Sequence, residues 1–358
     1  MTVRVLRLRI KDRHAEWLSE RAREANTVWN YCNDLSLCVW ERERRFMSGF
    51  DFWPYLKGVT KEGINLPVQT VQEIAEQYAV KRRAAEKTRL SWRKSRGARR
   101  SLGWLPFKVR TIRYEHCQVY YAGKWLSLWD SYGLDRFELR AGSFSEDARG
   151  RWYLNVAVKE PDFVGPRPLP AKSHCVGIDL GLKELAALST GDTVAAQRFY
   201  RELEPALAIA QRANRKGRAK AIHAKIANRR LDHLQKLSTR LVREHRAIFV
   251  GNVNAQVMTQ SRFAKSVLDA GWSTLRTMLQ YKCDRAGVWF VEVDEAYSTQ
   301  TCSACGNLPP QRPKGIAGLG IREWICGDCG TTHDRDVNAA RNILAVGHGR
   351  LVAGILGL

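Results

Sequence analysis

The sequence lacks any continuous apolar run of about 18 residues, which is the length that a transmembrane helix needs. Its opening segment, MTVRVLRLRIKDR, alternates arginine with valine and leucine, so it lacks the apolar core of a secretory signal peptide. We therefore expect a folded protein of the cytoplasm that has no membrane as a partner.

Acidic residues are scarce beside basic ones. Lysine and arginine number 59, and aspartate and glutamate number 36, which leaves a net charge of +23 and an isoelectric point near 9.9. Such an excess of one charge repels itself unless a polyanion neutralises it. Nucleic acid is therefore the expected partner; by charge alone an anionic membrane surface ranks second, and it is not the partner that we expect. A generically basic protein without such a partner is the plain alternative.

The nine cysteines do not have the pattern of a disulfide framework, because four of them fall into two matched pairs. These pairs are Cys302-Ser-Ala-Cys305 and, after 20 further residues, Cys326-Gly-Asp-Cys329. Two such pairs supply the four thiolates of a tetrahedral zinc site. A redox-active pair is the alternative. Because four thiolates leave no open position on the ion, the predicted zinc is structural.

Hydrophobic periodicity predicts an α+β protein of several parts. Residues 1–10 are predicted to form a half-buried strand, and residues 12–48 and 66–94 to form helices. Strands separated by turn signals follow from 105 to 158, as in an antiparallel sheet or barrel. Beyond a proline-rich linker, strands alternate with helices, which predicts an α/β domain with one central sheet. Its expected strands lie within 174–192 and at 247–250 and 288–295, and its expected helices at 211–246, 262–286 and 337–345.

Two segments concentrate the positive charge. Residues 81–110 carry twelve basic residues against one acid, with Trp92 and Trp104 between them, and residues 211–246 carry twelve against two. Cations that meet phosphates and flat rings that stack on bases are typical of nucleic-acid binding. A solvated helix face with two core tryptophans is the alternative for the first segment. The candidate contacts are Arg82, Arg83, Lys94, Arg229 and Arg230.

Two acidic motifs are candidate metal ligands. Asp179 ends an apolar strand in VGIDLG, as the first ligand of RNase H-like nucleases does. Asp334 and Asp336 lie at the start of a helix in HDRDVNAARNI. Each motif alone also fits a structural role, because aspartate commonly caps turns and helix starts.

In combination, these motifs resemble the TnpB proteins of bacterial insertion sequences, which are RNA-guided DNA nucleases related to the type V CRISPR effectors. The resemblance rests on VGIDLG, ANRRLDHLQKLST, AKSVLDAGW, AYSTQTCSACG, CGDCG and DRDVNAARNI, which occur in this order between residues 175 and 347. The N-terminal half matches in organisation: a first strand, a helical insert, LPVQTVQ, and PFK leading into strands.

The resemblance implies a division into four parts. It implies a RuvC-type, RNase H-like α/β domain that carries a zinc-ribbon insert, and an N-terminal wedge-like β-barrel that is interrupted by a helical recognition part. The implied boundaries are 1–10 and 105–165 for the barrel, 11–104 for the helical part, 166–297 and 331–358 for the nuclease domain, and 298–330 for the insert.

The resemblance also implies an activity. A guide RNA from the protein's own element would direct cleavage of double-stranded DNA beside a short adjacent motif, so that base pairing reads the sequence. Catalytic Mg²⁺ and structural Zn²⁺ are the implied metals, and the ribonucleoprotein is expected to contain one copy of the chain, in the bacterial cytoplasm at the nucleoid. Gln69 and Gln72 are candidates for reading the adjacent motif, since amide side chains read base edges. A plain helix surface is the alternative.

One expected acid is missing. The family supplies three carboxylates, of which Asp179 and Asp336 match the first and third, but the second position is Gly251. The next strand ends in Glu292, Asp294 and Glu295. Because neighbouring strands lie about 4.8 Å apart, a glutamate there could reach the vacated position. We hypothesise that Glu295 replaces the missing acid; the other two acids remain alternatives.

Three other functions stay open at this point. Without a second carboxylate, the protein would bind DNA under RNA guidance without cutting it and could act as a transcriptional repressor. An insertion-sequence transposase and a zinc-ribbon binding or structural protein are the rivals from other classes. The last of these leaves Asp179 and Asp336 unexplained.

Overall fold

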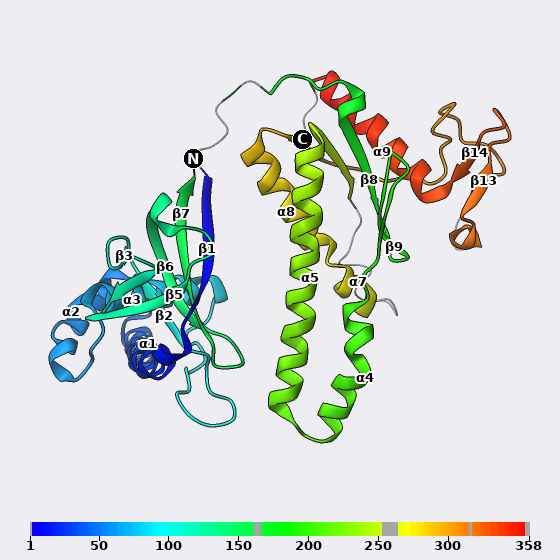
Figure 1. The fold of residues 1–358 in the computed structure, drawn as a ribbon. Coiled ribbons are helices and arrows are strands. Elements are labelled where there is room, and N and C mark those ends of the chain that lie inside the picture. The colour runs from blue at the N-terminus through cyan, green and yellow to red at the C-terminus, as the bar shows by residue number, and fades with distance from the viewer. Residues whose placement is uncertain (1, 161–164, 166, 253–263, 315–316, 355–358) are drawn as a thin grey trace. The chain divides into compact units, whose positions relative to one another are not determined.

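The computed structural model describes residues 2–160, 165, 167–252, 264–314 and 317–354. Figure 1 shows its helices and strands. The chain divides into two compact units, Met1–Pro161 and Asp162–Leu358. Both combine helices with sheets, as predicted. Among the described residues, no helix is long and apolar enough to cross a membrane. The finer division into four parts stays a prediction.

The first unit is built on a seven-stranded antiparallel sheet in the order β2-β6-β7-β1-β5-β4-β3, a half-barrel. The predicted first strand is confirmed as β1, Thr2–Ile10. Its side chains Leu6, Leu8 and Ile10 are each only 1% exposed and anchor the core of this unit. The other strands are β2 (Trp104–Phe107), β3 (Arg113–Glu115), β4 (Gln118–Tyr121), β5 (Lys124–Trp129), β6 (Glu138–Glu146) and β7 (Trp152–Glu160).

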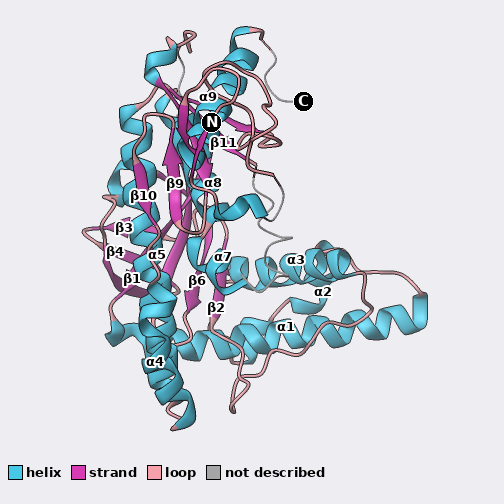
Figure 2. Cartoon of the chain, turned by 90° about the vertical axis from the view of Figure 1, so that its right-hand side faces the viewer, coloured by secondary structure: helices cyan, strands magenta, loops and turns pink. Residues whose placement is uncertain are grey.

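The helices of the first unit are α1 (Ala15–Glu43), the short α2 (Trp53–Leu56) and α3 (Val68–Ala85), and α1 and α3 run side by side (Figure 2). The predicted helix over 66–94 is too long, because α3 ends at Ala85 and Glu86 takes a left-handed conformation. The chain beyond it lies along α1 instead. There the side chain of Asn33 bonds both backbone groups of Leu90, and Asn30 bonds both of Arg93.

The second unit contains the predicted central sheet, in the order β10-β9-β8-β11-β12. Strand β11 is parallel to β8 and to β12, while β9 and β10 are antiparallel. The strands are β8 (Cys175–Leu180), β9 (Glu184–Leu188), β10 (Thr193–Ala195), β11 (Ala247–Gly251) and β12 (Trp289–Val293). The expectation that the strand after β11 lies beside it is therefore confirmed.

Helices cover both faces of this sheet. Helix α5 (Lys216–Glu244) and helix α8 (Trp272–Ala286) pack on the face of Ile178, Ile248 and Val250. Helix α9 (Arg335–Val352) packs on the opposite face, beside Phe249 and Val293. The contact is close because α9 meets glycine on β8: a Cβ on Gly177 would lie 2.1 Å from the carbonyl oxygen of Ala340.

The predicted helices of this unit are confirmed with shifted ends. Residues 211–246 contain the end of α4 (Phe199–Arg212) and all of α5. Residues 262–286 contain α7 (Ala264–Ala270) and α8, which are separated by the left-handed Gly271. The final helix is longer than predicted. A small two-stranded sheet, β13 (Glu323–Ile325) and β14 (Thr332–Asp334), precedes α9.

Candidate active site and metal centre

The sheet of the second unit presents three positions on the face that α9 covers. Alternation along β8 puts Asp179 on the same face as Cys175, and alternation along β11 puts Gly251 on the face of Phe249. The registers Val250↔Ile178 and Gly251↔Val293 bring these positions to one level of the sheet. Val293 is the last residue of β12, so a side chain two residues beyond it can reach the same place if the chain continues in the same direction.

Glu295 is that side chain. It follows Val293 by two residues, and its Oε2 lies 2.9 Å from the point where a Cβ on Gly251 would stand. The two alternative acids are differently engaged: Glu292 pairs with Arg276 at 3.1 Å, and Asp294 accepts the N–H of Ala296. Of the three acids at this strand end, Glu295 alone has its carboxyl oxygen over the vacated position.

The third acid comes from the start of α9. Asp334 caps this helix by accepting the N–H groups of Asp336 and Val337. The side chain of Asp336 is therefore not needed as the helix cap and can take part in other contacts. The carboxylate of Asp336 accepts hydrogen bonds from two arginines. Arg322 reaches one oxygen, and Arg335 reaches the other at 3.1 Å.

The electrostatics tie these acids together. Burial raises the pKa of Asp179 to about 8, and the negative charges of Asp336 and Glu295 contribute to this rise. Burial also raises the pKa of Glu295, and the neighbouring Asp294 adds to this rise. Asp179 and Glu295 hold their protons chiefly because they are buried, so a cation beside them is needed for both to ionise. The charge and the oxygen donors of these three acids suit a hard divalent metal ion, but among the described residues only the four cysteines already bring their ligand atoms close enough together to hold one.

Asparagines hold the segment that follows Glu295. Asn338 and Asn342, one turn apart on α9, both donate to the backbone oxygens of Ser298 and Thr301. Asn252, at the end of β11, accepts the N–H of Glu295 at 3.3 Å. None of these asparagines was among the predicted site residues. The spacing of Asn338 and Asn342 in DVNAARN, four residues apart, is the signal that could have indicated a shared contact.

The two cysteine pairs come together as predicted. The sulfurs of Cys302, Cys305, Cys326 and Cys329 all lie within 4.8 Å of one another. Cys302 and Cys329 are 3.6 Å apart, and Cys305 and Cys326 are 3.8 Å apart. Sulfurs about 2.3 Å from one tetrahedral ion are about 3.8 Å apart, so the cluster fits zinc. His333, whose Nε2 is 3.0 Å from the sulfur of Cys302, was not foreseen.

Comparisons with known proteins place these features in a family context. Residues 154–262 match a family model described as "Probable transposase" (OrfB_IS605), and residues 272–343 match the "Cas12f1-like, TNB domain" model. The resemblance to the TnpB family is confirmed.

Curated relatives of this chain carry names that fit the same family. A Streptomyces pristinaespiralis protein provisionally named an RNA-guided DNA endonuclease is 40% identical over 217 residues, which cover 57% of this chain and 52% of that protein. The CRISPR-associated endodeoxyribonuclease Cas12f1 of Sulfoacidibacillus thermotolerans is 25% identical, with coverages of 58% and 53%. The chain spans about half the length of the curated relatives it matches.

The fold has a solved counterpart. The Cas12f1 chain of a cryo-EM structure with sgRNA and target DNA aligns with a TM-score of 0.56 at 12% identity. The alignment covers 93% of this chain and 83% of that chain. At this identity, the likeness shows a shared fold.

The first basic segment divides into buried and exposed residues. Arg82 is only 2% exposed, and its guanidinium bonds Ser36 and the carbonyl oxygen of Met47, so the structure does not offer it to a nucleic acid. Trp104 is half-buried and packs edge-on against Trp29 at the border of the core, which agrees in part with the alternative interpretation of this segment. In contrast, Trp92 is 44% exposed. Three of the other residues predicted to contact nucleic acid lie on the surface: Gln69, Arg83 and Lys94. Gln72 is half-buried.

The second basic segment is largely open to solvent. Helix α5 buries Leu234, Leu237 and Leu241, and most of its lysines and arginines are exposed. The two arginines chosen from the sequence both have acidic partners: Arg229 pairs with Glu202, and Arg230 with Asp269, each at 2.8 Å. The exposed cations without an ion pair among the described residues, such as Arg240 and Arg243, are better placed to meet phosphates.

Proposed function

We propose that this protein is a Mg²⁺-dependent, RNA-guided DNA endonuclease of a transposable element. In this proposal, the second unit is a RuvC-type, RNase H-like nuclease domain with a zinc-ribbon insert, and Asp179, Glu295 and Asp336 are its metal ligands. The observation that carries the proposal is the carboxylate of Glu295 over Gly251, because it supplies the acid that the family carries at that position and this chain lacks.

The chemistry of the donors supports magnesium. Hard divalent cations take oxygen ligands, and all three side chains offer carboxylate oxygens. When bound in such a site, metal ions activate a water molecule and stabilise the leaving oxygen of the phosphodiester. The chain itself provides the carboxylates and holds their geometry. Asn252 positions the backbone of Glu295, and Arg335 and Arg322 orient the carboxylate of Asp336.

The partners follow from charge and resemblance. A chain of net charge +23 can neutralise two polyanions, and the proposed ones are a guide RNA from the same element and double-stranded target DNA. We propose that one copy of the chain serves each ribonucleoprotein, that zinc occupies the four cysteines, and that the complex works at the bacterial nucleoid. The first unit would be the wedge and recognition part, with Gln69 and Gln72 near the adjacent motif.

A cleavage assay tests the proposal. The protein is purified with its co-purifying RNA, the RNA is sequenced to design a target, and linear target DNA is incubated with Mg²⁺. We expect double-strand cleavage by the unaltered protein. Glu295→Ala should lose cleavage by roughly 10²-fold or more, the scale of a single electrostatic group in an active site, while binding to the target in a gel-shift assay persists.

The matched control is Glu292→Ala, which removes the same charge from within β12, where Glu292 pairs with Arg276 and not with the vacated position, and this variant should cleave normally. Full activity of Glu295→Ala would refute the role of Glu295. No cleavage by the unaltered protein with any divalent metal, together with guided binding, would leave the repressor-like alternative.

A further inference from the structure

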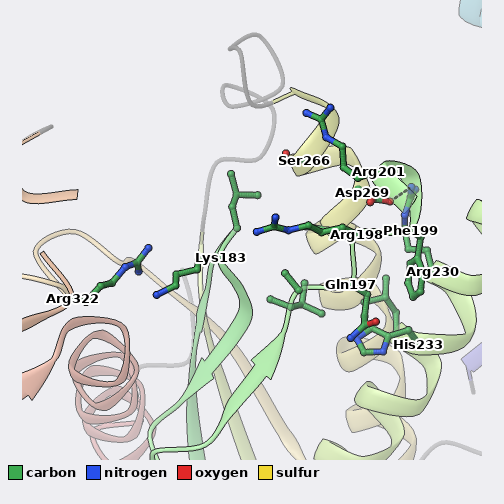
Figure 3. Close-up of a pocket in the computed structure, with 15 residues that line it drawn as sticks. Lys183, Gln197, Arg198, Phe199, Arg201, Arg230, His233, Ser266, Asp269 and Arg322 are labelled. Atoms are coloured by element: carbon green, nitrogen blue, oxygen red, sulfur yellow. Dashed lines mark hydrogen bonds and ion pairs between the residues drawn. The ribbon is translucent and has the colours of Figure 1, made fainter. Parts of the chain in front are cut away.

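A cavity of about 600 Å³ lies in the second unit. Strand β9, helices α5 and α7, and the N-terminal end of α4 contribute to its wall (Figure 3). Its apolar part includes Leu185, Leu234 and the ring of Phe199. Arg322 belongs to this wall and also holds Asp336, so the cavity and the carboxylate cluster share a residue.

The charged side chains of the wall are mostly basic. Arg230 is neutralised by Asp269 at 2.8 Å, and Arg201 by Glu204 at 2.9 Å. Lys183 and Arg198 make no ion pair with any residue in the described part of the chain. Figure 3 shows Lys183 and Arg322 reaching toward each other, with Arg198 directed toward the same space. Converging cations of this kind form a site for a phosphate group.

The remaining part of the wall suits a nucleobase. Leucine side chains and the Phe199 ring offer apolar surface, and the buried Nε2 of His233 makes no hydrogen bond within the described residues. The volume lies within the range of about 300–1,000 Å³ that is usual for small-ligand sites. A nucleotide combines what the two parts of the cavity can bind: an anionic phosphate and a flat base with polar edges.

We propose that this cavity holds one nucleotide of the DNA strand that enters the carboxylate site, with its phosphate at Lys183, Arg198 and Arg322 and its base on the apolar wall. The inference rests on the proposed nuclease function. It adds to the proposed active site a subsite that holds the DNA strand to be cleaved. The phosphate competes with Asp336 for the guanidinium of Arg322, so arrival of the strand leaves Asp336 with Arg335 as its remaining arginine partner.

Alkylation at a single engineered cysteine tests the occupant locally. Ser266 on α7 lines the cavity, and Ser266→Cys is alkylated in the full chain without Mg²⁺ and without guide RNA. We expect a six-nucleotide thymidine DNA to slow this alkylation severalfold. The exposed native Cys38, in the first unit, is the internal control and should react at an unchanged rate. Mass spectrometry distinguishes the two sites.

Two other probes separate the possible sources of the phosphate. Equal protection by a six-nucleotide uridine RNA would overturn the assignment to the DNA strand and favour the guide. Equal protection by inorganic phosphate alone would overturn the assignment of a nucleotide, because the base would then contribute nothing.

Variants connect the protection to the cations. Lys183→Ala in the Ser266→Cys protein should weaken the DNA affinity by about tenfold, which corresponds to 1.4 kcal/mol. Lys183→Arg should retain it. The matched control is Arg350→Ala, which removes an exposed charge from the last turn of α9. In this variant, DNA should slow the alkylation of position 266 as much as it does without the substitution. Equal losses in Lys183→Ala and Arg350→Ala would overturn the proposal.

This readout is independent of cleavage. If DNA protects position 266 but the protein never cleaves its target, the proposed nuclease activity is refuted and the proposed nucleotide site in the cavity stands. If the protein cleaves its target but DNA does not protect position 266, the proposed nucleotide site is refuted and the proposed nuclease activity stands.

Discussion

Glu295 and Gly251 together fill one position of the sheet: the carboxyl oxygen of Glu295 lies 2.9 Å from where a side chain on residue 251 would begin. Only one of the two positions can carry a long side chain, because both point into the same space. Gly251→Ala should therefore displace the carboxylate of Glu295 and slow cleavage by at least about tenfold, the effect seen when the support of a metal ligand is disturbed.

The exchange should also work in reverse. In the double variant Gly251→Glu with Glu295→Ala, the carboxylate returns to β11 and the space for it is vacated. We expect this variant to cleave target DNA faster than either single variant, which is a strong departure from additivity. Cleavage rates of all four proteins measure it, and thermal melting verifies that each is folded. A double variant as slow as the product of the two single effects would contradict the shared position.

The raised pKa of Asp179 makes a prediction about pH. Its pKa of about 8 in the folded protein is far above the value of about 3.9 in an unfolded chain. The folded state therefore binds more protons between these values, and the contribution of Asp179 to stability declines as pH rises from about 4 through 8. Without metal, Asp179→Asn should melt several degrees above the unaltered protein at pH 9, at roughly 2–4 °C per kcal/mol.

The same comparison at pH 5 is the control, because the unaltered protein then keeps the proton on Asp179 and the difference in melting temperature should shrink. Adding Mg²⁺ at pH 9 should stabilise the unaltered protein more than the asparagine variant. A difference that does not depend on pH would show that the pKa of Asp179 is not raised in the folded protein.

Asn338 stabilises the turn after Glu295. It is fully buried, donates to the backbone oxygens of Thr301 and Ser298, and accepts the N–H of Ser303. Asn338→Ala leaves these groups without their partner, which costs about 1–3 kcal/mol of stability. Chemical denaturation should detect this loss, and cleavage should slow because Glu295 loses its support. Arg341→Ala, on the exposed side of α9, is the control, and equal stability of the two variants would contradict the role of Asn338.

How far the sequence predicts this molecule depends on whether a feature is local. The adjacency of consecutive strands can be inferred from the sequence, and with the strand spacing it led to the hypothesis that Glu295 reaches the position of Gly251, with Glu292 and Asp294 as alternatives. The cysteine spacing is local. The end of α3 at Ala85 is different, because Asn30 and Asn33 of another helix compete for the backbone of the segment that follows.

The nucleic-acid contacts chosen from the sequence show the same limit. Arg82 belongs to a basic segment, but its position on α3 turns it into the core, where Ser36 and Met47 take its hydrogen bonds. Charge density along a chain does not reveal which side of a helix faces inward unless the apolar stripe is clear. On α5 the stripe is clear, and there the exposed cations follow the expectation.

Removal of the proposed zinc should unfold the segment that carries the four cysteines, because this ion takes no part in the proposed cleavage reaction. We expect zinc in stoichiometric amount by elemental analysis, and Cys302→Ser should lower it. Four thiolates around one ion would hold the proposed insert together, and classical zinc modules lose their fold without metal. Limited proteolysis should then cut within residues 298–330. Exposed Cys38→Ser is the control, and an insert that resists proteolysis after chelation would contradict a structural metal.

The exposed cations of α5 should contribute affinity without sequence preference. Phosphates present the same charge at every base pair, so Arg240→Ala with Arg243→Ala should weaken binding of the ribonucleoprotein to all targets alike. Each duplex phosphate contact that is lost should also lower the slope of log affinity against log salt by about 0.9. The paired variant Gln69→Ala with Gln72→Ala gives the contrast. It should change the preference for the adjacent motif and leave the salt slope as it is. A change of motif preference in the arginine variant, or an unchanged slope, would show that α5 does not track the phosphate backbone.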